Sequence, residues 1–116
     1  MIPEEILKQI LPEYLVKYFY ITQAHEENEV LHIEFEEKNA VPEEFSNRLL
    51  NSKGFLPSIT IEDFPLRGRA VRLHIKRRRW KDMDSGEILQ RDWNLVAKGT
   101  KMTADFAAFL KEVRRY

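Results

Sequence analysis

The segment 69–80 constrains the fold more than any other part of the chain, because apolar and polar side chains alternate along it. Successive side chains of a β-strand point to opposite faces of a sheet, so this pattern predicts a long strand with one buried and one exposed face. The predicted core positions are Val71, Leu73 and Ile75, and the predicted outward positions are Arg72, His74, Lys76 and Arg78.

The other segments predict a mixed α+β domain. Apolar spacing over residues 3–19 is typical of an amphipathic helix, which Pro12 should break into two short helices or kink near Leu11. Residues 18–24 and 30–37 alternate and predict a β-hairpin with an acidic outer face. Residues 39–53 fit either a helix start near Pro42 or an ordered loop.

The second half adds further strands and a terminal helix. Residues 59–64 predict a strand that Pro65 should stop. The turn formers at 81–86 predict a second hairpin, with 87–95 as the returning strand. Thr103 is a candidate cap for a helix with an apolar stripe. We therefore expect an antiparallel sheet of about four to five strands, with an N-terminal and a C-terminal helix packed on one face.

Length and composition indicate one domain, 1–116. The chain has no cysteine, which excludes disulfides, thiolate zinc cages and cysteine nucleophiles. The first residues do not resemble a signal peptide, and no apolar stretch approaches the roughly 20 residues of a bilayer span. The sequence thus predicts a cytoplasmic protein with no membrane association.

Charge is segregated along the chain. Residues 1–52 carry four basic and eleven acidic side chains, a charge of −7, whereas residues 53–116 carry 15 basic and 8 acidic ones, a charge of +7. Between residues 66 and 81 there are eight cations and no carboxylate. Arginine binds phosphate in a bidentate way, and alternate strand positions lie about 6.6–7 Å apart, so the segment could contact several phosphates together.

Nucleic-acid binding is therefore the first function predicted from the residues. The alternative is a solvated face whose arginines pair with the acidic first half. The candidate phosphate contacts are Arg67, Arg69, Arg72, Lys76, Arg77, Arg78, Arg79 and Lys81, with Arg91, Lys98 and Lys101 widening the patch.

Trp80 and Trp93 flank the predicted 81–86 turn. They could pack against each other across the hairpin, or they could stack on unpaired bases and bind RNA or single-stranded DNA. Trp80 is accordingly included among the candidate DNA-binding residues.

We expect no catalytic residue, no metal and no cofactor. The three histidines, His25, His32 and His74, are scattered in sequence, without a carboxylate or cysteine at metal-ligand spacing. The aspartates and glutamates of the second half lie near turns and beside arginines, as in a solvated hairpin, and no phosphate loop or nucleophile motif occurs. The chain is therefore predicted not to be an enzyme.

Three stretches of the second half resemble the N-terminal region of ISAon-type insertion-sequence transposases. The residues that carry the resemblance are 54–69 (GFLPSITIEDFPLRGR), the strand ending in Arg77-Arg78-Arg79-Trp80, and 91–103 (RDWNLVAKGTKMT). The resemblance extends from about Leu11 to Val113 and is strongest from Gly54 onward.

The same middle segment is similar in outline to the N-terminal zinc-ribbon region of a wider DDE transposase group. In that group, a basic strand leads into a cysteine-bearing knuckle, whereas residues 81–86 of this chain have no cysteine. This departure excludes that zinc site and suggests that a plain hairpin with its tryptophans substitutes for it. In the related group a helix-turn-helix follows the ribbon, so the helix from Thr103 could be its first element, with base-reading residues beyond Tyr116.

The resemblance implies a non-catalytic domain that contacts the terminal inverted repeats of the element, while the catalytic carboxylates lie on a separate segment or subunit. The expected partners are transposon-end DNA and the catalytic transposase segment or subunit. The alternative is a protein-interaction module, in which the acidic half of one chain meets the basic half of the catalytic subunit or of a second copy in a homodimer.

Overall fold

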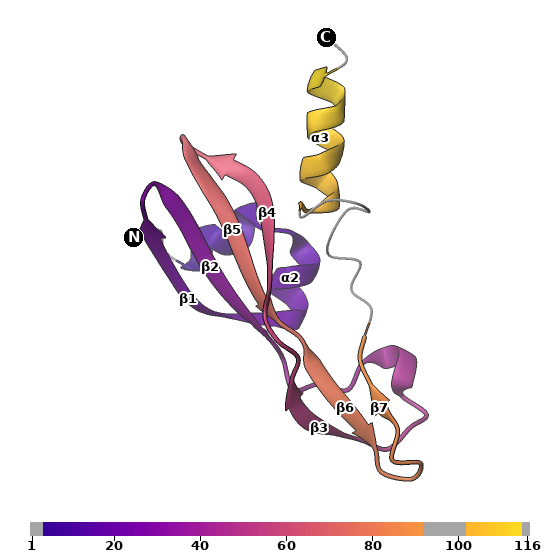
Figure 1. Cartoon of the computed structure of the whole chain (residues 1–116). Coiled ribbons are helices and arrows are strands. Elements are labelled where there is room, and N and C mark those ends of the chain that lie inside the picture. The colour runs from indigo at the N-terminus through magenta and orange to yellow at the C-terminus, as the bar shows by residue number, and fades with distance from the viewer. Residues whose placement is uncertain (1–3, 92–101, 115–116) are drawn as a thin grey trace.

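The described residues form an α+β fold with seven strands in two sheets, which confirms the predicted class. The computed structural model describes residues 4–91 and 102–114. The two sheets follow one another along an elongated molecule of 53 × 34 × 22 Å (Figure 1). Its radius of gyration of 16.0 Å exceeds the roughly 13 Å of a compact domain of about 100 residues, because the sheets do not stack as layers.

Two short helices open the chain, as Pro12 predicts. Helix α1 spans Glu4–Ile10 and α2 spans Glu13–Tyr18, with Pro12 at the N-cap of α2. The buried side chains Leu7, Leu11 and Leu15 recur every four residues across this break. They therefore form one apolar ridge that covers a sheet face.

The larger sheet contains four strands in the order β1-β2-β5-β4. Their bounds are Phe19–Glu27 for β1, Val30–Glu37 for β2, Ile59–Leu66 for β4 and Arg69–Lys76 for β5. The predicted alternation holds in the two central strands, which bury their apolar positions against α1 and α2. These buried positions are Leu31, Ile33 and Phe35 on β2 and Val71, Leu73 and Ile75 on β5.

The two central strands are parallel, whereas an antiparallel sheet was predicted. Strand β2 pairs with β5 from Val30–Ala70 to Glu36–Lys76, while β1–β2 and β4–β5 are antiparallel hairpins. Alternation reveals which face of each strand is buried, but not which distant strand lies beside it. The direction of this long-range pair is decided by tertiary packing.

Strand β4 continues past Pro65, where it was predicted to stop. The ladder with β5 is irregular between Asp63 and Leu66. Because β4 is an edge strand, a residue without an N–H group is tolerated at such an irregularity.

The predicted strand 69–80 is divided between two sheets. Strand β5 ends at Lys76, and β6 (Arg78–Asp82) begins the smaller sheet, in the order β3-β6-β7. Its partners are β3 (Leu50–Phe55) and the short β7 (Ile88–Leu89), and a 3₁₀ turn at Glu43–Phe45 precedes β3. The undecided segment 39–53 thus supplies a turn and most of a strand, and Figure 1 shows β5 leading directly into β6.

Helix α3 (Ala104–Arg114) lies beside the edge of β4 and extends away from the sheet (Figure 1), rather than covering the face that α1 and α2 cover. Thr103 caps the helix as predicted, since its hydroxyl accepts a hydrogen bond from the Phe106 N–H. Phe64 contacts the rings of Phe106 and Phe109, each at a centroid distance of 5.4 Å. No helix in the described parts of the chain is long and apolar enough to cross a membrane.

Candidate nucleic-acid interface

The cations of the larger sheet are exposed. Arg72 and Lys76 lie on the face of β5 opposite the core, and Arg67 lies in the β4–β5 turn. Arg67 and Gly68 both have positive φ, of 48° and 79°, as in the two-residue turns that suit the twist of a hairpin. None of these three cations forms an ion pair with a described residue.

The surroundings of this face are mixed in charge. Arg72 is paired in register with Glu62 on β4, and Lys76 with Glu36 on β2. Arg69 forms an ion pair with Glu26 at 2.8 Å, and about half of each side chain is exposed (45% and 46%). Such an exposed pair stabilises the fold by only about 0–1 kcal/mol, so phosphate can compete for Arg69.

Arg78, predicted as a phosphate contact, bonds to other parts of the protein. Its Nε donates to the carbonyl oxygen of Glu37 at 2.8 Å, and its Nη1 donates to Ser52 Oγ at 2.7 Å. The guanidinium also lies 4.6 Å from the centroid of the Phe55 ring. These contacts use two of the three guanidinium nitrogens, which a phosphate would have to share.

Arg77 and Arg79, on either side of Arg78, are half-buried. The Nε atom of each is buried without a hydrogen-bond partner among the described residues, and neither side chain has an ion pair there. The stems of these arginines therefore pack against the protein, and no carboxylate among the described residues pairs with their charge.

One face of the smaller sheet collects cations from two strands. The register pairs Lys81 with Asn51, Trp80 with Ser52 and Arg78 with Phe55, so the β-bulge at Lys53 and Gly54 lies opposite Arg79. Alternation places Arg79 and Lys81 on the face opposite Trp80.

Lys53 brings a third cation beside Arg79 and is exposed. Lys53 was not among the predicted contacts, because it lies at the end of segment 39–53, whose structure the sequence left open. Gly54 was a sequence signal for a bulge, and its φ of 86° agrees with that role. A glycine alone, however, does not identify the strand that lies beside it.

Trp80 is 1% exposed, which corrects its assignment as a DNA-binding residue. A buried indole cannot stack on a base, so only one of the two tryptophans is left as a candidate for stacking on unpaired bases. Its described cross-strand partner on β7 is Leu89. Trp93, the other tryptophan that could pack against it, lies outside the described residues.

Arg91, predicted to widen the patch, contacts an acidic and an aromatic side chain. Its Nε lies 3.1 Å from Glu44 Oε1, and its guanidinium lies 4.7 Å from the centroid of the Tyr18 ring. Lys98 and Lys101, the other two residues predicted to widen the patch, lie outside the described residues.

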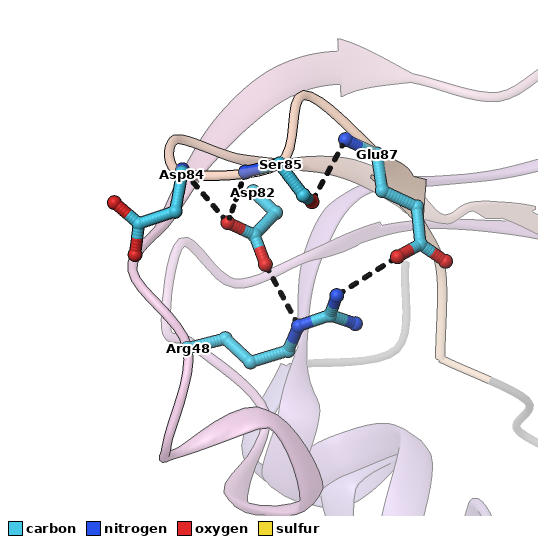
Figure 2. Close-up of polar contacts among 5 residues, drawn as sticks. All are labelled: Arg48, Asp82, Asp84, Ser85 and Glu87. Atoms are coloured by element: carbon cyan, nitrogen blue, oxygen red, sulfur yellow. Dashed lines mark hydrogen bonds and ion pairs between the residues drawn. The ribbon is translucent and has the colours of Figure 1, made fainter.

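The β6–β7 turn uses its carboxylates to hold its own shape (Figure 2). Asp82 Oδ1 accepts hydrogen bonds from the N–H groups of Asp84 and Ser85, and its Oδ2 lies 2.8 Å from Arg48 Nε. Arg48 also reaches Glu87, with Nη2 2.8 Å from Oε2. These backbone hydrogen bonds are the largest cause of the lowered pKa of Asp82.

The three histidines come together, contrary to their scattered positions in sequence. The rings of His25 and His32 stack at 5.0 Å, as do those of His32 and His74. The three rings form a row across β1, β2 and β5 on the outer face of the larger sheet. His74 is also 2.9 Å from the hydroxyl of Thr60 on β4.

Comparisons with protein families, curated proteins and solved structures give no match for this chain. The resemblance to transposase N-terminal regions therefore stays a prediction. What the structure adds to it is the position and pairing of each described cation.

Proposed function

We propose that this chain is a non-catalytic domain that binds duplex DNA through the cations of residues 67–81 and Lys53. One observation carries the proposal. Of the eight cations in that segment, Arg69 and Arg78 have partners, and the other six have no carboxylate partner among the described residues.

The alternative to DNA binding is a solvated face whose arginines pair with the acidic first half of the chain. The ion pairs and hydrogen bonds of the described residues account for only part of this charge. The acidic first hairpin neutralises Arg69 through Glu26, and Glu37 accepts hydrogen bonds from Arg78. The remaining cations would keep a positive field that a polyanion can neutralise with release of its counterions.

The smaller sheet is the best candidate for the contact. It is a narrow antiparallel ribbon, and ribbons of this kind enter the major groove or follow the phosphates beside it. Arg79 and Lys81 are two residues apart on one strand, hence about 6.6–7 Å apart, and Lys53 lies beside them. The half-buried stem of Arg79 lowers the entropy that its side chain loses on binding.

The resemblance to insertion-sequence transposases suggests which DNA the domain binds. In this proposal the ligand is the terminal inverted repeat of a mobile element, and the catalytic carboxylates belong to a separate segment or subunit. Contacts to phosphates would position the domain on the DNA, while sequence would be read elsewhere.

Fluorescence anisotropy with a labelled terminal-repeat duplex and a scrambled duplex, over a salt series, tests the proposal. Arg79→Met and Lys81→Met remove a charge and keep most of the stem. Each should weaken binding to both duplexes and lower the log–log salt slope by about 1. Lys8→Met, an exposed cation on α1, is the matched control and should leave affinity and slope unchanged.

Unchanged affinity in the Arg79 and Lys81 variants would refute the phosphate contacts. If the wild-type chain binds neither duplex but self-associates at low salt in size-exclusion chromatography, the assembly module is the correct function. Binding to single-stranded but not duplex oligonucleotides would point to RNA or single-stranded DNA as the ligand.

A further inference from the structure

We propose that His25, Glu27 and His32 form a binding site for a divalent transition-metal ion of the zinc class on the outer face of the β1–β2 hairpin. The ligand atoms that these three side chains offer all lie within 4.8 Å of one another. This inference is independent of the proposed DNA binding and concerns a different sheet.

The hairpin register brings the three side chains to one place. His25 and Glu27 are two residues apart on β1, so they share a face, and His25 is paired in register with His32 on β2. The two-residue turn at Asn28 and Glu29, with φ of 52° and 62°, fixes this register. Along the sequence, the spacing of these three residues does not look like that of metal ligands. In the hairpin, however, His25 and His32 are a cross-strand pair, and Glu27 is two residues from His25 on the same strand.

The donor set fits the chemistry of zinc. Two imidazole nitrogens and a carboxylate oxygen are ligands of the kind that catalytic zinc sites use, with the fourth position left open to water or substrate. Bond lengths of about 2.0–2.2 Å bring neighbouring ligand atoms to roughly 3.4 Å in a tetrahedral site. Glu27 is exposed, so its side chain can rotate to close the remaining distance.

A second histidine orients His32. The Nδ1 of His32 lies 2.8 Å from the Nε2 of His74, and the Nδ1 of His74 lies 2.9 Å from the hydroxyl of Thr60. If His32 donates from Nδ1 and His74 donates from Nδ1 to Thr60, the lone pair of His32 Nε2 is left for a metal ion. Hydrogen bonds of this kind hold metal-binding histidines in the required tautomer and ring orientation.

His25 contributes an atom that is otherwise unexplained. Its Nδ1 is buried and has no hydrogen-bond partner among the described residues. A buried polar atom without a partner costs free energy, and a metal ion bound by His25 would account for keeping an imidazole at this position.

The composition makes the test direct. The chain has three histidines, all in this row, and no cysteine. Imidazole coordination detected in the untagged full chain must therefore come from this row. Titration calorimetry with Zn²⁺ should show one saturable site, and Co²⁺ should give ligand-field absorption bands that Zn²⁺ abolishes.

Three variants and one control locate the site. Glu27→Gln and His32→Ala should each abolish the Co²⁺ bands or weaken Zn²⁺ binding by about tenfold or more, with the fold checked by circular dichroism. Glu29→Gln is the matched control. Glu29 lies in the turn after Glu27 but outside the cluster, so this variant should bind as the wild type does. His74→Phe keeps a ring in the row and removes the hydrogen bond, so affinity should fall about 10–100-fold, as for other residues that position a ligand.

Failure of the wild-type chain to bind Zn²⁺ at one equivalent, or equal binding by the Glu27→Gln and Glu29→Gln proteins, would overturn the proposal. Because Glu27 is exposed, its substitution should not unfold the chain, so this comparison remains decisive even if His32→Ala is unstable.

Discussion

The backbone N–H of Arg78 donates to the carboxylate of Glu37 at 3.1 Å, and the Nε of Arg78 donates to the Glu37 carbonyl oxygen at 2.8 Å. These two hydrogen bonds join the first residue of β6 to the last residue of β2, so they hold the smaller sheet at the end of the larger one. Glu37 is 2% exposed. An arginine in the middle of a basic run is thus part of the framework.

Arg78→Ala should lower the free energy of unfolding by about 1–3 kcal/mol, because it removes charge-assisted hydrogen bonds at a half-buried junction. Urea denaturation measures the effect. Arg72→Ala, at an exposed position of the same basic segment, should change stability by no more than about 0.5 kcal/mol. Equal stability of the two variants would contradict the structural role of Arg78. Alanine substitution of all three residues 77–79 would therefore change stability as well as charge, so it would not test DNA binding alone.

Trp80→Ala should cost about 3–5 kcal/mol of stability, since it leaves a large cavity in the smaller sheet. The chain has two tryptophans, so Trp93→Phe isolates the fluorescence of Trp80. Acrylamide should quench that fluorescence weakly, and addition of single-stranded oligonucleotide should leave it unchanged. Strong quenching by either reagent would mean that the indole is accessible.

Thr103→Val should detach α3 from the edge of β4. The Thr103 hydroxyl donates to Asp63 Oδ1 at 2.9 Å and caps the helix through Phe106, and both Thr103 and Asp63 are buried. Loss of the cap and of the Asp63 partner should cost about 2 kcal/mol and speed amide hydrogen exchange in α3. Thr22→Val, which removes an exposed hydroxyl bonded to a backbone carbonyl, should have little effect. Unchanged exchange in α3 would show that the remaining contacts with β4, the Thr103 N–H bond to the Glu62 carbonyl oxygen and the Phe64 rings, are enough to hold the helix.

Asp82 should make stability depend on acidic pH. Its pKa lies below the ordinary value of 3.8, chiefly because the N–H groups of Asp84 and Ser85 donate to it, with Arg48 adding to the effect. A carboxyl whose pKa is lower in the folded state contributes its stability above the unfolded pKa and loses it as the pH falls through the folded pKa. The melting temperature of Asp82→Asn should therefore be lower than that of the wild type at neutral pH, and the two should converge below about pH 4. A constant difference at every pH would argue against the ionised carboxylate as the cause.

Local features of the chain were predicted well because local chemistry decides them. Pro12 separates two helices, and Thr103 caps α3. The alternation of Leu31, Ile33 and Phe35 with polar residues assigns the buried face of β2. Each of these features depends on a few neighbouring residues, on backbone geometry or on the period of two along a strand.

The candidate site was predicted only in part. Sequence identified the basic segment, but a cation on a strand does not show what its guanidinium touches. Arg78 and Arg79 are neighbours with the same side chain, yet one is bonded to Glu37 and Ser52 and the other has no such partner among the described residues. Lys53 was missed because its place beside Arg79 depends on a bulge and on a pairing across more than twenty residues.

By itself, then, the sequence determined the class of the fold, the buried face of each central strand and the concentration of positive charge in one segment. Tertiary structure decided that β2 and β5 run parallel, that the long basic strand divides at Arg77, and that three distant histidines form one row. The physical reason is that strand period and helix capping are properties of neighbouring residues, whereas strand partners and registers are chosen by packing over the whole chain.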